Sequence, residues 1–139
     1  MADAQGDETA SQGLTRVEVE RFFAVRERAW LAKDLDAYMS LWAEDVEFTT
    51  PDAGDTIHGR DALRAFIAAN FEAPGEPASL SIDHYAINGD VLLHEWTLTT
   101  RLEGSSEPHV LRGMAVCGFR DGRVIWWRDY YSHDRPEGS

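Results

Sequence analysis

The residues best suited to chemistry lie near the C-terminus, in the stretch 121–131. An Asp-Gly pair opens it and predicts a tight hairpin turn, and the β-branched and aromatic residues that follow are typical of a strand. Side chains alternate along a strand, so one face carries Ile125, Trp127, Asp129 and Tyr131. If this face lines a pocket, burial raises the pKa of the Asp129 carboxyl toward the range useful for proton transfer. The alternative is an Asp129 that pairs with a surface arginine and has no catalytic role.

A second carboxylate is expected on the long strand predicted at 90–102. One face of that strand carries Leu93, Glu95, Thr97 and Thr99, and one face of the next strand carries Leu111, Gly113, Ala115 and Cys117. If these faces join that of Asp129, two carboxylates share a pocket in which small residues leave room for a ligand. Two nearby carboxylates do not both ionise readily, so one can act as acid and the other as base. The competing interpretation has Glu95 facing solvent.

The predicted site therefore has two catalytic residues, Asp129 and Glu95, and a set of ligand-binding residues around them. This set comprises Trp30, Phe48, Thr50, Thr97, Leu111, Gly113, Trp127 and Tyr131. The five histidines show no His-x-His or His-Glu-x-x-His spacing, so no metal site is predicted. Glycine-rich phosphate motifs and serine-nucleophile elbows are absent from the sequence, and no cofactor is predicted. The single cysteine, Cys117, is expected to be a packed thiol.

Composition excludes several classes of partner. The 139 residues include 25 acidic and 13 basic side chains, which give a net charge of −12. Nucleic acids and anionic membrane surfaces would be repelled. The first residues are acidic and polar, unlike a secretory signal, and a cytoplasmic protein is expected.

The elements that must position the site follow from periodicity. Apolar spacing predicts helices at about 16–33, directly after Asp34, and at 61–71, with a short strand at 46–50. Four strands then follow in a meander, at 79–87, 90–102, 109–119 and from 123 onward. The predicted organisation is one domain over 14–134, between a disordered tail at 1–13 and a C-terminal tail at 135–139. The expected fold class is α+β, with three N-terminal helices on one face of a curved sheet.

Four segments carry a family resemblance: LWAEDV at 41–46, GRDAL at 59–63, FRDGRVI at 119–125 and WRDYY at 127–131. With the element order, they resemble the nuclear-transport-factor-2-like superfamily, and within it the SnoaL-like and limonene-epoxide-hydrolase-like branch. The resemblance covers about 15–133. It implies a cone-shaped α+β fold with a curved, mixed or antiparallel sheet. Because this fold hosts isomerases, cyclases, hydrolases, dioxygenase subunits and binding modules, it does not define an activity.

The resemblance assigns roles position by position. SnoaL-like polyketide cyclases use an Asp on the last strand as general acid and base, which Asp129 matches. Epoxide hydrolases of this type use the same Asp, but here Glu95, Thr97, Phe48 and Thr50 stand at or near the positions of their Arg, Asp, Tyr and Asn. Ketosteroid-isomerase-like members place their base before the Pro that follows the first strand, where this chain has Thr50.

The resulting function hypothesis is a cofactor-independent cyclase, isomerase or hydrolase that acts on a small, mostly apolar metabolite. The alternatives are a non-catalytic ligand-binding or accessory protein, an epoxide hydrolase with a degenerate catalytic set, and a purely structural dimer module. A homodimer is expected because the outer sheet face is too apolar to leave in water. That face carries Arg112, Met114, Val116, Trp126, Arg128 and Tyr130.

Overall fold

A computed structural model describes residues 13–133 of the chain. The predicted tails at 1–13 and 135–139 lie outside the described residues, apart from Gly13. The helices are α2 (Arg16–Ala32), α3 (Leu35–Met39) and α4 (Arg60–Glu72). The strands are β1 (Trp42–Thr49), β2 (Ile57–His58), β3 (Glu76–Asn88), β4 (Val91–Arg101), β5 (His109–Arg120) and β6 (Arg123–Tyr130).

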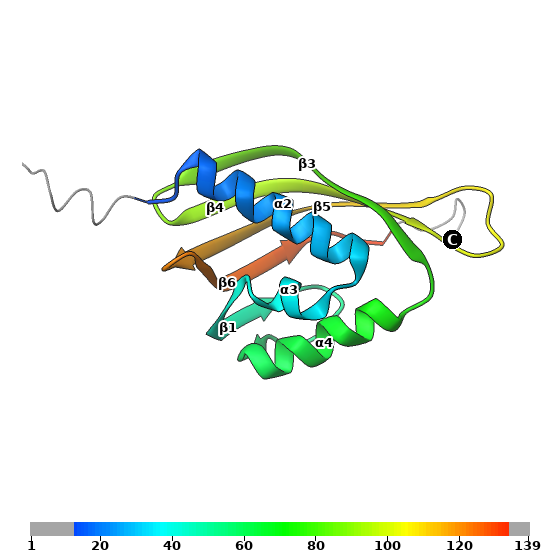
Figure 1. Cartoon of the computed structure of the whole chain (residues 1–139), viewed down its shortest axis with the longest axis horizontal. Coiled ribbons are helices and arrows are strands. Elements are labelled where there is room, and N and C mark those ends of the chain that lie inside the picture. The colour runs from blue at the N-terminus through cyan, green and yellow to red at the C-terminus, as the bar shows by residue number, and fades with distance from the viewer. Residues whose placement is uncertain (1–12, 134–139) are drawn as a thin grey trace, which may run out of the picture.

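The six strands form one mixed sheet in the order β2-β1-β6-β5-β4-β3. The predicted meander is confirmed, because β3, β4, β5 and β6 pair antiparallel in chain order. β1 joins the outer edge of β6 in parallel, and the short β2 pairs antiparallel with β1 to form the next strand of the sheet. The α+β fold class is therefore confirmed, with a mixed sheet that stays open between β2 and β3 (Figure 1).

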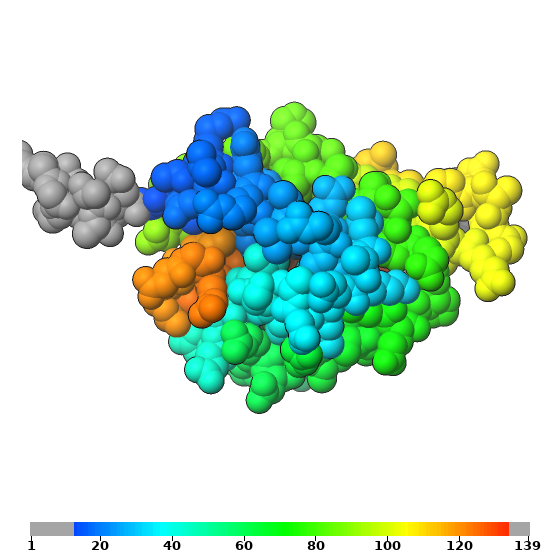
Figure 2. All heavy atoms as spheres, in the orientation of Figure 1, coloured from blue at the N-terminus to red at the C-terminus, as the bar shows by residue number. Residues whose placement is uncertain are grey.

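Three helices pack on one face of the sheet (Figure 1). α2 begins with a capping box, in which Thr15 and Glu18 satisfy each other's backbone N–H groups. Its buried stripe is Val19, Phe22, Arg26 and Ala29, spaced as one helical face requires. Figure 2 shows the helix atoms covering the middle of this face, with the β5–β6 turn emerging at one end and the β4–β5 hairpin at the other.

The inward face of β6 is set by a bulge. The β5–β6 register shifts between Gly118 and Phe119, so Val124 is fully buried along with Trp127. Ile125, predicted to share the face of Trp127, lies at the bulge and is only half-buried. Beyond the bulge the alternation resumes with Asp129, which pairs with the inward-facing Ala115 of β5.

The predicted inward face of β4 is wrong by one residue. Leu92, His94 and Trp96 are the buried residues of this strand, whereas Glu95 is exposed and Thr97 bonds outward to Asp83. Because the side-chain period is two, a shift of one residue reverses every side chain of the strand. Burying Leu92 and Trp96 against the helices removes more apolar surface from water than burying Leu93 and Thr97 would, and this decides the orientation.

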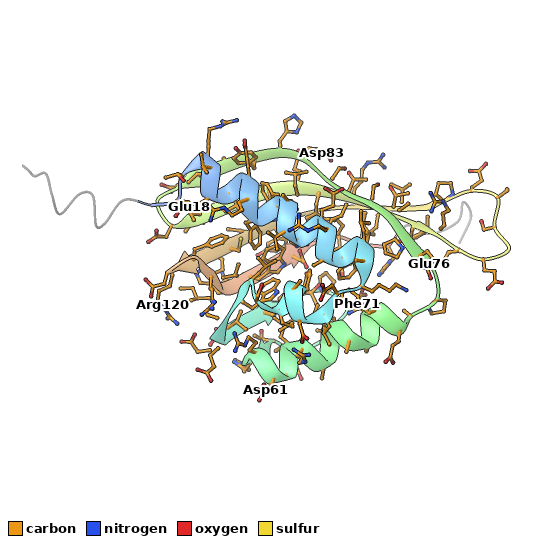
Figure 3. The ribbon with its side chains drawn as sticks, viewed as in Figure 1. Glu18, Asp61, Phe71, Glu76, Asp83 and Arg120 are labelled. Atoms are coloured by element: carbon orange, nitrogen blue, oxygen red, sulfur yellow. The ribbon has the colours of Figure 1, made fainter. Side chains whose placement is uncertain are left out.

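The two ends of the inward face differ. Glu76 and Arg120, labelled in Figure 3, mark opposite ends of the sheet. The end near Glu76, here called the hairpin end, is where the β4–β5 hairpin extends past the helices. Aromatic rings fill the interior between these ends. Phe71 at the end of α4 packs edge-on against Trp30 of α2 and Tyr38 of α3, with ring centroids 5.1 and 6.0 Å apart.

Candidate active site

A cavity of about 280 Å³ lies between the sheet and the helices at the hairpin end. Its volume is close to the lower end of the range for small-molecule pockets, roughly 300 Å³. The apolar part of the wall comes from Trp30, Tyr38, Phe48, Phe66, Ile67, Pro74, Leu80, Trp96, Leu98, Leu102, Leu111 and Tyr131. The polar part comes from Arg26, Thr50, Asp52, Asn70, Thr100, His109, Asp129 and His133. Such a wall suits a compact, largely apolar molecule with a few polar groups.

Asp129 lies at the inner end of this cavity. Burial raises the pKa of its carboxyl above the usual value, and the Trp127 indole, the Arg26 guanidinium and the Thr50 hydroxyl oppose this shift only in part. Its Oδ1 atom is buried and has no hydrogen-bond partner among the described residues. A carboxyl in this environment retains its proton to a higher pH than a surface carboxyl, so it can both donate and accept a proton.

Arg26 supplies a positive charge that acts on this carboxyl. It projects from the inner face of α2, and its guanidinium carbon lies 4.9 Å from the centroid of the Trp127 ring. The Tyr38 hydroxyl lies beside it, and burial raises the pKa of this phenol although the guanidinium opposes the shift. The inner end of the cavity thus brings together a carboxyl, a guanidinium and a phenol from β6, α2 and α3.

Four residues, here called the mouth network, link the cavity to solvent. Tyr131 donates a hydrogen bond of 2.8 Å to Asp52, and its oxygen lies 3.1 Å from the Thr50 hydroxyl. The His133 Nε2 atom lies 3.1 and 3.2 Å from the two Asp52 oxygens. Burial, reinforced by Asp52, raises the pKa of Tyr131 to about 12, so this phenol stays protonated at neutral pH. The network joins the residues that follow β1 to those that follow β6.

Two further buried titratable groups lie behind the cavity wall. Burial, with the charge of Arg26, lowers the pKa of His94 to about 3, and neither ring nitrogen has a hydrogen-bond partner among the described residues. The His94 ring packs between Phe23 and Trp127, with centroids 5.2 and 5.1 Å away. Burial also raises the pKa of the Cys117 thiol, so this thiol is not a nucleophile. Both groups are neutral parts of the core.

Most of the predicted site residues border the cavity. The structure places Asp129 there with Trp30, Phe48, Thr50, Leu111 and Tyr131. Thr50 reaches Asp129 because β1 and β6 run parallel with Thr49 paired to Arg128, so the next residues of both strands are neighbours.

Four predicted site residues are not in the cavity wall. Glu95 lies on the outer face, where its carboxylate is 2.8 Å from the His84 ring, and Thr97 also faces outward. Trp127 is 1% exposed and packs in the core beneath Asp129. Gly113 leaves no room for a ligand, because a Cβ atom there would lie 2.6 Å from the Trp96 ring.

Arg26, Tyr38, Trp96, Asp52 and His133 border the cavity but were absent from the predicted site. A signal existed for Arg26, since it is a charged residue within the apolar stripe of α2. Asp52 and His133 follow strand ends in loops, where periodicity carries no information. His58 lies on the surface, where its Nδ1 atom is 3.7 Å from a carboxylate oxygen of Glu47.

A second hollow, of about 420 Å³, opens at the opposite end of the sheet, near Arg120. Its charged residues are surface groups, and Arg120 bonds to Asp45 at 2.8 Å. The end near Asp129 is therefore the better candidate site. Within residues 13–133, no three His, Cys, Asp or Glu side chains gather as a metal site. No helix of the same part of the chain is long and apolar enough to cross a membrane.

Comparisons with known proteins agree on the family and fold. A family model for the SnoaL-like domain matches residues 19–127. No curated protein matches the chain. Among solved structures, an epoxide hydrolase of the limonene-epoxide-hydrolase-like type from Mycobacterium tuberculosis is similar, with a TM-score of 0.67, 18% identity, and coverage of 84% of each chain.

Two further structures are also similar. A protein of Catenulispora acidiphila with a ketosteroid-isomerase-like fold, solved with trimethylamine, has a TM-score of 0.69 and 20% identity over 80% of this chain and 85% of that chain. A candidate SnoaL-like polyketide cyclase from a Jannaschia species has a TM-score of 0.67 and 18% identity over 87% and 91%. At these identities the likeness defines the fold alone.

Proposed function

Because this chain belongs to the SnoaL-like domain family, we propose that it is a cofactor-independent enzyme that acts on a small, mostly apolar metabolite by acid–base catalysis at Asp129. One observation carries the proposal: a buried carboxyl, whose pKa burial raises, borders an apolar cavity. Enzymes place carboxyl groups in such surroundings when a side chain must exchange a proton with a substrate near neutral pH.

The chemistry that best suits the site is a proton shuttle by a single carboxyl. Asp129 takes a proton from an activated C–H group of the substrate and then delivers it to another carbon or oxygen atom of the same molecule. The carboxyl regains its starting state, as an isomerase or a cyclase requires. Glu95 has no part in this step because it faces away from the cavity. A hydrolase of the two-carboxylate kind is less well supported for the same reason.

A non-catalytic ligand-binding protein is the second candidate. It is favoured by the mouth network, in which the second carboxylate of the cavity wall, Asp52, is already engaged by Tyr131 and His133. In this reading Asp129 holds a ligand hydroxyl and transfers no proton.

The two candidates differ in a test that needs no knowledge of the natural substrate. A panel of small enolisable ketones, incubated with the protein in D₂O, reports proton abstraction as deuterium incorporation measured by mass spectrometry. We expect the wild type to accelerate exchange for some panel members and the Asp129→Asn variant to lose at least a hundredfold of that rate. The matched control is Glu95→Gln, which removes an outward-facing carboxylate and should leave the rate unchanged.

A carbon-detected NMR titration of the carboxyl groups supplies the second measurement. One aspartate signal should titrate above the usual value of 3.8 and disappear in Asp129→Asn. If Asp129 titrates at or below 3.8 and no ketone exchanges faster than in buffer, the catalytic proposal fails and the binding protein becomes the better reading.

A homodimer is the second part of the proposal. The outer sheet face carries an apolar group across β4, β5 and β6, here called the outer patch: Leu93, Met114, Val116, Trp126 and Tyr130. Met114 and Tyr130 are paired neighbours and are 41% and 57% exposed. Neither belongs to the helix-covered face, so a second copy could bury both and leave the cavity accessible.

A further inference from the structure

Arg26 is a buried charge to which acid–base catalysis at Asp129 gives no role. Its side chain is only 8% exposed, and its Nε atom is buried without a hydrogen-bond partner among the described residues. Within residues 13–133 no carboxylate lies at ion-pair distance from the guanidinium. Yet Arg26 borders the cavity beside Asp129.

A buried guanidinium in this position needs a hydrogen-bond acceptor. Arginine does not lose its proton in proteins, so burial cannot neutralise it as it can neutralise a lysine or a carboxyl. Its stacking on the Trp127 ring compensates part of the lost hydration but satisfies none of its N–H groups. A buried charge is ordinarily retained where a partner of opposite charge approaches it.

The other polar groups nearby are also donors. The indole nitrogen of Trp96 borders the cavity and is buried without a partner among the described residues. The Tyr38 hydroxyl lies beside Arg26, where its oxygen can accept one guanidinium N–H, and it keeps its own proton for donation because burial raises its pKa. The carboxyl that faces these donors is that of Asp129, whose pKa burial raises. Donors thus exceed acceptors at the inner end of the cavity.

We propose that Arg26 anchors an anionic oxygen of the ligand, so that the cavity selects small apolar or aromatic acids that carry a carboxylate or an enolate. The inference rests on the proposed cavity as the ligand site, but not on Asp129 as the catalyst. The planar guanidinium can hold such a group through two parallel hydrogen bonds, while the aromatic walls enclose the rest of the molecule. At a net charge of −12 the protein surface repels acids, so the preference must arise inside the cavity.

Three probes of nearly equal shape test the charge preference: 1-naphthoate, the neutral 1-naphthamide and the cationic 1-naphthylmethylamine. Isothermal titration calorimetry at pH 7.5 gives the affinity of each for the full-length protein. We expect naphthoate to bind about 10- to 100-fold more tightly than naphthamide, the range that a hydrogen-bonded charge usually supplies. The amine should bind most weakly.

Variants test whether Arg26 causes the preference for naphthoate. In Arg26→Gln, naphthoate should fall to the affinity of naphthamide, whereas naphthamide itself changes little. Arg26→Lys keeps the charge and should retain part of the preference, which provides a test should the glutamine variant fold poorly. Arg28→Gln is the matched control, because Arg28 lies on the same helix with its side chain exposed. Circular dichroism melts verify that each variant is folded.

Each result is decisive. Equal affinity for naphthoate and naphthamide, or a naphthoate preference that survives in Arg26→Gln, overturns the inference while the proposed catalysis at Asp129 stands. Tighter binding of the amine also overturns it and identifies an ionised Asp129 as the dominant charge. If no probe binds at millimolar concentration, the cavity does not take aromatic molecules of this size and the inference fails, while the ketone exchange assay decides the catalytic proposal separately. A naphthoate preference that depends on Arg26 supports the inference even if Asp129→Asn leaves ketone exchange unchanged.

Discussion

His94 and Asp129 lie in one inward row of the sheet, with Ala115 paired between them. Burial lowers the pKa of His94 and raises the pKa of Asp129. Because the pKa of His94 is lowered, the unfolded chain binds a proton at this residue below pH 6.5, whereas the folded protein binds it only near pH 3. The contribution of neutral His94 to stability is therefore lost as pH falls through this window. The raised pKa of Asp129 means that its contribution is lost as pH rises above 3.8.

The His94 effect can be measured by difference. Replacing His94 with Phe removes the titrating ring, so the free energy of unfolding of the variant should fall by about 2 kcal/mol less than that of the wild type between pH 7 and pH 5. Urea unfolding at both pH values measures it. The control is His84→Gln, which removes an exposed histidine. If the free energy of unfolding of His94→Phe depended on pH as that of the wild type does, the His94 imidazole would not be the source of this pH dependence.

Asp129 could be predicted from sequence at the residue scale because its strand carries a turn signal and strong alternation. Arg26 could not, although its position in an apolar helical stripe is visible. Periodicity states that a residue faces inward, but not whether its charge has a partner there, because that partner comes from an element far along the chain. The roles of Asp52 and His133 were hidden for the same reason, since both lie in loops joined only by tertiary contacts.

The helices and strands show how much of the secondary structure can be predicted from sequence periodicity and turn signals alone. The helices and the meander were predicted nearly to their observed bounds, because helical spacing and Asp-Gly or Asn-Gly turns are local signals. The face of β4 that points toward the helices was not predicted correctly. Both of its faces carry apolar residues, with Leu93 on one and Leu92 on the other, and only packing against the helices selects between them. The β6 bulge and the parallel β1–β6 pairing likewise depend on contacts between distant segments.

Gly113 of β5 gives a prediction at this scale. A Cβ atom there would lie 2.6 Å from the Trp96 ring and 2.9 Å from the Cβ atom of Tyr131, which the strand backbones hold close. Gly113→Ala should therefore displace both aromatic side chains and lower the free energy of unfolding by about 1–3 kcal/mol. It should also weaken naphthoate binding, because both rings form the cavity wall.

Urea denaturation and calorimetry measure the two effects of Gly113→Ala. Arg112→Ala is the comparison, since the neighbouring side chain points outward and its loss should change neither quantity by more than about 0.5 kcal/mol. Unchanged stability in Gly113→Ala would mean that Trp96 and Tyr131 have room to move.

The part of the chain that the structure describes has two unlike faces: helices cover one face of the sheet (Figure 1), and the outer patch lies on the other. We expect the wild type to sediment as a dimer at micromolar concentration in analytical ultracentrifugation, and Met114→Asp to sediment as a monomer. A buried aspartate without a partner costs several kcal/mol in an interface.

Val17→Asp is the control for the dimer. It places the same charge on an exposed apolar residue of α2, away from the patch, and should leave the dimer intact. If the wild type is monomeric, or if Met114→Asp remains dimeric, the outer patch is not a dimer interface.

The parallel pairing of β1 with β6 also governs when the site can form during synthesis. Thr50 and Tyr131, whose hydroxyls bond at the cavity mouth, are 81 residues apart in the chain. The helices and β1 leave the ribosome early, but the strand that supplies Asp129 and closes the edge of β1 leaves last. Until then β1 and the apolar faces of α2 and α4 lack their cover, and such nascent chains are prone to aggregation and dependent on chaperones. Folding of this domain is therefore expected to begin only after β6 has left the ribosome and to be slow for its size.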